Sequence, residues 1–504
     1  MLKRLFILLM SLAWTIAIEA QHQPSDTICL GDTLVSEMAD SLPTKASIHP
    51  WRTTGEIVLA NGVTYLLGRY VFKMPFSQTT LKTTRNNFKS GFAWDDDNFY
   101  VNMAGHAYHG SVYFNAARSN GMNFWQSVPY TTVGSIIWEY LGENEQPSIN
   151  DVICTTFSGS FMGEITHNMY HQLIDDSERG MKRFFREATA AILNPVGEFH
   201  RVISGQAWKV KRNVIDDTTG TSPTDKQEAI YSLTLGDRCL ISSEESSSRR
   251  HQPFLTFTME YGDVADGEKH CSPYDFFIFD SSIAIGKDQH LLSHLFMLGR
   301  LCSTPAFTKE NARGEFGLYQ FFDYDDTRLP GNSTHTPFPF GEIVSFGPGV
   351  MFSFPQIAPR IAIEQRFFTK GIVLGAIKSD YYKYYNRTYN MGSGFGALSQ
   401  SKMTWKNVGN LQLKAQYMHL FTWKGYEPRD LSEIHFNKSN YLNVLGDRSN
   451  ARLLCLSLQT AAFVSQEVGI TLGASYYSRH THYKYFPNHQ ASSYEMRAGV
   501  EWHF

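Results

Sequence analysis

The sequence is poor in charge and has no apolar run long enough to cross a bilayer as a helix. Charged residues make up only 18% of its 504 positions, below the ~25% that is usual in soluble globular proteins. The formal net charge is -3, so no basic surface is available and nucleic-acid binding is not expected. Beyond the first twenty residues no stretch of about 18 uninterrupted apolar residues occurs, which excludes a helical membrane bundle.

Cysteine patterns and cofactor motifs are also missing. The six cysteines are scattered without CxxC spacing, so neither a zinc ribbon nor a disulfide framework is indicated. The sequence contains no Walker loop, no GxSxG nucleophile elbow and no HExxH. Glu164, His167 and His171 have a spacing that could place them on one helix face, but surface histidines are the commoner outcome of such a pattern. The sequence therefore predicts no cofactor and no metal centre.

Aromatic residues and alternating segments are abundant. Aromatic residues make up 14% of the chain, with 36 Phe and 26 Tyr, and together with the low charge they suggest a lipid-facing surface. From about residue 205 onward, segments of roughly ten residues alternate apolar and polar positions between polar or glycine-rich turns. Leu255, Phe257 and Met259, for example, alternate with Thr256 and Thr258. This pattern is typical of transmembrane β-strands, which present one side to lipid and the other to a lumen.

The last eleven residues of the sequence give the strongest single indication of a transmembrane barrel. Apolar or aromatic residues occupy every second position from Tyr494 to Phe504. An alternating strand that closes on an aromatic residue resembles the signal by which outer-membrane barrels are recognised by their assembly machinery. A soluble β-sandwich would alternate equally well, but it accounts for neither the terminal Phe504 nor the aromatic excess. We predict an α+β fold, in which an N-terminal helical domain precedes a C-terminal antiparallel transmembrane β-barrel of about 12 strands.

The N-terminus predicts export. Lys3 and Arg4 precede an apolar run from Leu5 to Ile18, and Ala20 stands before polar Gln21, as in a cleaved secretory signal peptide. The run is shorter than the ~20 residues of a spanning helix, so an uncleaved anchor is the lesser alternative. We expect a signal peptide over 1–20, a linker over 21–50, a helical domain over 51–204 and an outer-membrane barrel over 205–504.

The predicted helical domain carries polar residues inside apolar stretches. Helical spacing predicts helices over 51–72, 98–119, 123–141 and 179–193, and another that starts at Ser148, with Asp151 three positions later as in a capping box. Burying a charge without a partner costs several kcal/mol, so these polar residues must be paired, solvated or functional. The catalytic candidates are His106, His109, Glu139 and Asp151. The binding candidates are Asn115, Arg118, Glu143 and Glu164.

These candidates have two interpretations. His106 or His109 could act as an imidazole base that faces the carboxylates of Glu139 and Glu143, which lie one turn apart. Alternatively, the same residues form a hydrogen-bonded network that locks packed helices together. Asp151 is also explained by its place in a helix cap.

Several motifs resemble an uncharacterised family of Gram-negative outer-membrane proteins. The motifs are WDDDNF at 94–99, HAYHGS at 106–111, NAARSNG at 115–121, FWQS at 124–127, WEYLGE at 138–143 and PSIND at 147–151. The resemblance covers roughly residues 50–205. The family is classed as a domain of unknown function. The resemblance therefore implies an outer-membrane location and the predicted architecture, but no reaction.

A looser similarity is to VanZ-like proteins, in which an early histidine, a helix glutamate, a Ser-x-x-Asp and spaced glycines recur. The corresponding positions here are His106, Glu139, Ser148, Asp151, Gly159 and Gly163. Thr155 stands where that pattern has an asparagine. The similarity implies an envelope-lipid or glycan context.

Two functional hypotheses follow. In the first, an outer-membrane barrel carries a periplasmic-side helical domain that binds or modifies an envelope lipid or glycan. In the second, the protein is not an enzyme, and its helices serve a structural, plug or transport-associated role. Outer-membrane lipid and the barrel assembly machinery are the expected partners in both, and the substrate is unknown.

Overall fold

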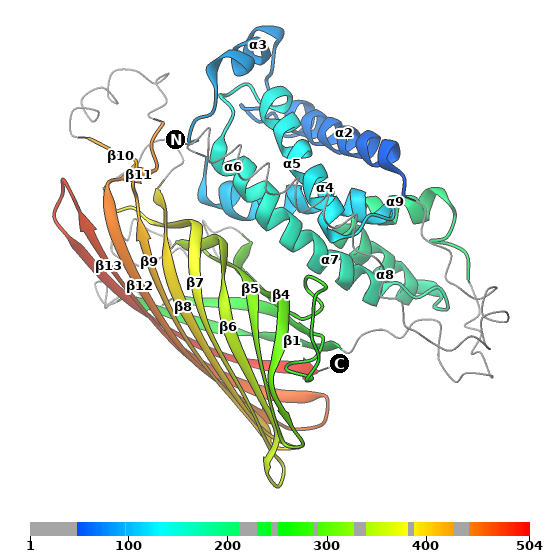
Figure 1. Cartoon of the computed structure of the whole chain (residues 1–504), viewed down its shortest axis with the longest axis vertical. Coiled ribbons are helices and arrows are strands. Elements are labelled where there is room, and N and C mark those ends of the chain that lie inside the picture. The colour runs from blue at the N-terminus through cyan, green and yellow to red at the C-terminus, as the bar shows by residue number, and fades with distance from the viewer. Residues whose placement is uncertain are drawn as a thin grey trace, which may run out of the picture.

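The structure, a computed structural model, describes residues 48–95, 97–210, 229–242, 250–285, 291–326, 339–381, 388–427 and 443–503. Helices form the first part of the chain and strands the second (Figure 1). The predicted signal peptide, nearly all of the predicted linker and Phe504 lie outside the described residues. No described helix combines the length and the apolar character needed to cross a membrane.

Twelve of the described strands close into one antiparallel barrel in the order β1-β14-β13-β12-β9-β8-β7-β6-β5-β4-β3-β2. Their bounds are β1 Ala229–Ser242, β2 Arg250–Tyr261, β3 Phe277–Ala284, β4 Leu292–Lys309, β5 Ala312–Asp325, β6 Phe340–Ala358, β7 Ile361–Lys378, β8 Tyr389–Trp405, β9 Gly409–Phe421, β12 Ser449–Phe463, β13 Val468–Tyr483 and β14 His489–His503. The first and last strands close the barrel, from Ser232 opposite His503 to Ser242 opposite Ser493. A separate parallel pair is formed by β10 (Gly425–Tyr426) and β11 (Gly446–Asp447). The predicted barrel of about 12 strands is confirmed.

The two faces of the barrel wall differ in chemistry. On β5, Phe316 and Leu318 point outward and are 50% and 41% exposed. The residues between and beside them point into the lumen, where Glu315 accepts from Arg300 at 2.9 Å and from the Tyr319 hydroxyl at 2.6 Å. A polar, internally paired lumen inside an apolar outer wall is the arrangement of a transmembrane barrel.

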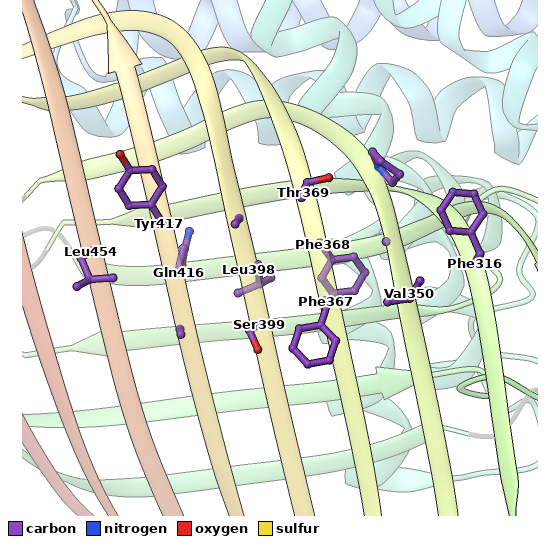
Figure 2. Close-up of a pocket in the computed structure, with 14 residues that line it drawn as sticks. Phe316, Val350, Phe367, Phe368, Thr369, Leu398, Ser399, Gln416, Tyr417 and Leu454 are labelled. Atoms are coloured by element: carbon purple, nitrogen blue, oxygen red, sulfur yellow. The ribbon is translucent and has the colours of Figure 1, made fainter. Parts of the chain in front are cut away.

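The outer wall carries an apolar hollow of about 560 Å³. Phe316, Val350, Phe367 and Leu454 line it from neighbouring strands (Figure 2). Its lining is suited to contact with lipid chains.

The helical domain, by which we mean the helices from α2 to α9, contains the predicted helices and two that the sequence pattern did not predict, α3 and α9. The bounds are α2 Pro50–Leu66, η1 Leu67–Val71, α3 Leu81–Ser90, η2 Val101–Gly105, α4 His106–Ser119, α5 Phe124–Ile137, η3 Trp138–Gly142, α6 Ile149–Ile153, η4 Cys154–Ser158, α7 Gly159–Leu173, α8 Gly180–Leu193 and α9 Pro195–Ile203. Each η segment is a wider helical turn that continues an α-helix. Segment η1 follows α2, η2 precedes α4, η3 follows α5 and η4 joins α6 to α7. The expected cap is present, because the Ser148 hydroxyl accepts from the Asp151 backbone N–H at 3.4 Å.

The helical domain packs against the outside of the barrel wall. Phe322 and Tyr324 belong to the same outward row of β5 as Leu318, yet both are fully buried. Phe99, just before η2, stacks on Tyr324 with ring centroids 5.3 Å apart. The outward Gln320 side chain donates to the Phe157 carbonyl of η4 at 3.2 Å. The described helices therefore lie beside the barrel and not in its lumen (Figure 1).

Two glycines let the central helices of the domain touch. A Cβ atom at Gly159 of α7 would lie 2.5 Å from the Gly110 Cα of α4, and one at Gly110 would lie 2.1 Å from the Thr155 carbonyl oxygen. α4 carries His106 of the candidate site, and η4, which runs directly into α7, carries Thr155. The close approach of α4 to η4 and α7 therefore helps to set the geometry of that site.

We predict that Gly159→Ala destabilises the helical domain by about 1–3 kcal/mol, because the added methyl group must push α4 and α7 apart. Gly62→Ala is the matched control, since a Cβ atom there meets nothing within 4 Å and alanine favours the helix by up to ~1 kcal/mol. Urea unfolding of the detergent-solubilised protein, followed by near-UV circular dichroism, measures both. Equal stability of the two variants would contradict the close approach.

Candidate functional site

His106 and Asp151 meet at the centre of the helical domain. His106 opens α4, Asp151 lies in the first turn of α6, and the His106 Nε2 atom is 3.3 Å from Asp151 Oδ1. This contact lacks hydrogen-bond geometry, so Nε2 has no hydrogen-bond partner among the described residues. The other ring nitrogen, Nδ1, is 3.4 Å from the Thr155 hydroxyl of η4. Both His106 and Asp151 are buried, at 6% and 1% exposure.

A hydrogen-bonded network extends from this pair to the barrel. The Asn150 amide donates to Asp151 Oδ1 at 2.9 Å and to Asp95 Oδ1 at 2.8 Å. The Asn102 amide donates to the same Asp95 oxygen at 2.8 Å and to the Tyr389 hydroxyl of β8 at 2.5 Å. The site is thus held between the helices and the outer face of one barrel strand.

Glu139 belongs to the same network. Its Oε2 atom accepts from the Ser148 backbone N–H at 2.7 Å, and the Ser148 hydroxyl donates to the Asn150 side-chain oxygen at 2.8 Å. The second oxygen, Oε1, is buried and has no hydrogen-bond partner among the described residues. Three of the four catalytic candidates, His106, Glu139 and Asp151, are therefore brought together.

The fourth catalytic candidate, His109, faces a different neighbourhood. Its Nε2 atom is 2.7 Å from the Tyr113 hydroxyl, which also donates to Asn61 of α2. The His109 ring lies edge-on to Trp138, with centroids 5.1 Å apart. Trp138 in turn donates to Glu143 at 2.7 Å. Since this second set has its own partners, His109 and Glu143 lie beside the His106 network and not in it.

The remaining binding candidates lie near the other end of α4. Arg118 pairs with Glu164 of α7 at 2.8 Å and donates to the Met122 carbonyl at 2.7 Å. The Asn115 amide donates to the Thr166 hydroxyl at 3.0 Å. Arg118 is twelve helical positions, or about 18 Å, from His106. These contacts join α4 to α7 rather than extend the site. Among the described residues no group of His, Cys, Asp and Glu is arranged to hold a metal ion.

The environment changes the protonation of the network. Burial lowers the pKa of His106 to about 4, although nearby Asp95 opposes the shift. Burial raises the pKa of Asp151 well above its usual value, and Asp95 and Glu139 raise it further by repulsion. Burial also raises the pKa of Glu139, with repulsion from Glu143 adding to the effect. The network thus combines an imidazole whose proton affinity is lowered with carboxyl groups whose proton affinity is raised.

The sequence interpretation missed Asp95, Asn102, Asn150 and Tyr389 as members of the network. Asp95 lies in a run of acidic residues before a helix, a pattern that is usually solvated. Asn102 and Asn150 have no motif of their own, and Tyr389 is more than 230 positions from every helical member. The available signal was the place of Asp95, Asn102 and Asn150 in or beside the WDDDNF and PSIND motifs.

Residues 91–196 match the family described as Domain of unknown function (DUF3943). The predicted resemblance to an uncharacterised family is therefore confirmed. The DUF3943 segment contains every helical member of the network, from Asp95 to Thr155, and ends before the barrel begins. The similarity to VanZ-like proteins stays a prediction, and no curated protein matches the chain.

Solved structures of outer-membrane proteins align with the barrel part. The NanC porin aligns at 9% identity over 53% of this chain and 98% of that chain, with a TM-score of 0.26. The KdgM porin aligns at 7% over 53% and 98%, with a TM-score of 0.23. OmpT of Vibrio cholerae aligns at 7% over 56% and 98%, with a TM-score of 0.23. The barrel is established by the strand pairing described above and not by these matches.

We predict that the helical domain loses stability as pH rises from about 6.5 to about 8. The raised pKa of Glu139 means that the folded domain keeps a proton which the unfolded chain releases above about pH 4.5. The stabilisation that this retained proton gives the folded domain is complete below about pH 4.5. It is lost as pH rises, by up to ~1.4 kcal/mol per pH unit for one group. His106 opposes the trend only below about pH 6.5, where the unfolded histidine gains a proton.

The variant Glu139→Gln should therefore show a shallower fall in stability across this pH range than the native protein. Urea unfolding monitored by near-UV circular dichroism at several pH values gives the slopes. His109→Gln is the control, because burial lowers the pKa of His109 to about 3 and it stays neutral in the folded domain across the range. The unfolded histidine binds some protons only near pH 6.5, which opposes the trend, so its removal should not make the fall in stability shallower. An unchanged slope in Glu139→Gln would rule out a proton on this carboxyl group.

Proposed function

We propose that the barrel anchors the helical domain in the outer membrane, and that the His106 network binds or modifies an envelope lipid or glycan. One observation carries the proposal: His106 Nε2 and Glu139 Oε1 are buried polar atoms without hydrogen-bond partners among the described residues. Leaving such an atom unsatisfied costs about 1–3 kcal/mol. Polar groups of a ligand that enters the network would supply the missing partners.

The residues have distinct proposed roles. His106 is the base that takes a proton at Nε2, because its imidazole is neutral at physiological pH. The Thr155 hydroxyl lies 3.4 Å from Nδ1 and is placed to orient the ring, whereas Asp151 lies 3.3 Å from the reacting Nε2. Glu139, whose pKa is raised by burial, is the acid. Asn150 and Ser148 are positioning residues that hold the two carboxyl groups. We place the base at His106 rather than His109, since the Tyr113 hydroxyl already engages His109 Nε2.

The membrane setting supports a substrate from the envelope. Asn102 ties the network to Tyr389 at 2.5 Å, and Tyr389 lies on the outward row of β8 that continues to exposed Phe395. The proposal is that a ligand reaches the network from the outer surface of the barrel, where lipids and their glycan headgroups meet the wall. The proposal includes export by a cleaved signal peptide and insertion by the assembly machinery through β14.

A transport-associated role is the second candidate. The barrel lumen contains a cavity of about 570 Å³ whose lining includes Glu260, Arg366 and Lys402. Such a cavity can hold a small charged solute. The helices lie outside the wall, so a plug role is not favoured by their position.

We predict that deleting the gene changes the lipid or glycan profile of the outer membrane, and that His106→Gln fails to restore it. Removing a general base costs about 10²–10⁴-fold in rate, and Asp151→Asn should impair turnover by disturbing the imidazole. Mass spectrometry of extracted lipid A, phospholipids and glycans measures the outcome. Heat-modifiable gel mobility of each variant reports whether the barrel has assembled.

His171→Gln is the matched control, because His171 is an exposed histidine of α7 in the same domain. It should restore the native profile. Full restoration by an assembled His106→Gln variant would refute the proposed chemistry and leave the network with a structural role. Solute uptake by liposomes containing the purified protein tests the transport candidate separately.

A further inference from the structure

One face of α2 and η1 is exposed and entirely non-polar. Between residues 55 and 72, every exposed residue other than Gly55 is aliphatic or aromatic. They are Val58, Leu59, Val63, Leu66, Leu67, Tyr70, Val71 and Phe72. We call this set the α2 face. Soluble proteins seldom expose so large a continuous apolar patch, so such a surface marks contact with a partner or with lipid.

The polar residues of the same helix are turned into the domain. Asn61 donates to the Gly134 carbonyl of α5 at 3.3 Å. Arg69 folds back and donates to the Tyr65 hydroxyl at 2.7 Å and to the Thr79 carbonyl at 2.9 Å. Glu56 accepts from the Asn120 amide at 2.6 Å. Between residues 55 and 72 the helix therefore turns its polar side chains inward and presents apolar ones outward, the reverse of a helix on a water-facing surface.

The position of the domain puts this face where lipid is expected. The η4 segment packs against β6 of the barrel wall, whereas α2 packs on α4 and α5. Figure 1 shows α2 on the side of the domain that is turned away from the barrel. The wall that the helices cover continues, along the same strands, into exposed apolar residues such as Leu318 on β5 and Phe395 on β8. Because the domain covers a wall that would otherwise contact lipid, we expect lipid beside the domain at the same depth.

The length and the ends of the face fit a bilayer. Residues 55–72 of a helix extend about 26 Å at ~1.5 Å per residue, and outer-membrane barrels carry an apolar band of ~25 Å. Trp51, which is 88% exposed, and Arg52 stand before the face. Lys73 stands directly after it and is exposed. Tryptophan and basic residues at the two ends of an apolar segment are typical anchors at the membrane surface.

We propose that the α2 face contacts lipid acyl chains, so that the helical domain lies beside the barrel within the membrane. The proposal does not rest on the reaction suggested for His106. It assigns the domain a lateral lipid interface that continues the lipid-facing wall of the barrel.

Photo-cross-linking of the full-length protein in its native outer membrane tests the proposal. A diazirine amino acid replaces Leu59, Val63 or Leu66 in turn. Leu456, on the exposed outer side of β12, is the lipid-facing reference, and Gln412, which lines the lumen, is the water-facing reference. Heat-modifiable gel mobility identifies the variants whose barrel has folded. Because three positions are tested, the experiment still gives a result if one variant fails to fold.

The expected result is a phospholipid or lipid A adduct at the α2 positions, detected by mass spectrometry, with a yield comparable to Leu456 and far above Gln412. Adducts at Leu456 but at none of the α2 positions would overturn the proposal. Cross-links from α2 to a second copy of this chain, or to another protein in place of lipid, would overturn it as well.

Discussion

The docking of the helices onto the outer wall of the barrel is the contact on which the rest of the structure depends. Phe99 stacks on Tyr324 at a place on β5 where a barrel of this kind would otherwise meet lipid. The same surface ties Asn102 to Tyr389 and so fixes one end of the candidate site. If the helices were detached, the outward rows of β5 and β8 would expose large aromatic residues and the network would lose its barrel anchor. Apolar burial and a few hydrogen bonds thus join anchor and site in one body.

The candidate site places several titratable side chains in a buried environment. Asp95, Glu139 and Asp151 lie within one buried network, where neighbouring carboxyl groups raise the proton affinity of Glu139 and Asp151. His106 is kept neutral by burial and has one nitrogen without a hydrogen-bond partner among the described residues. An arrangement built only for stability would pair these groups or replace them with apolar ones. The retained polar atoms are therefore the feature that a function must explain.

Much of the fold is encoded in local pattern and could be predicted from the sequence. Two-residue alternation revealed the strands, and caps such as Ser148 revealed helix starts, because both signals depend only on neighbouring positions. The sequence named His106, Glu139 and Asp151 as candidates, but their convergence could not be predicted because it depends on how their helices pack. The contribution of Tyr389 and the position of the helices against the outer wall could not be predicted, since both depend on contacts between residues hundreds of positions apart. The split between His106 and His109 also escaped prediction, because one turn of α4 places the two rings against different neighbours.

The most direct test of the account is a cysteine cross-link between the helical domain and a chosen face of the barrel wall. Phe99→Cys is combined with Tyr324→Cys, which faces outward, or with Tyr319→Cys, which lies on the same strand and faces the lumen. Exposed Cys271 and Cys302 are replaced by serine in both variants, and a short thiol-specific cross-linker is applied to cells. The account predicts an internal cross-link for the pair at 99 and 324 and none for the pair at 99 and 319. A cross-link to position 319, or none at either position in correctly assembled protein, would contradict the docking of the helices on the outer wall.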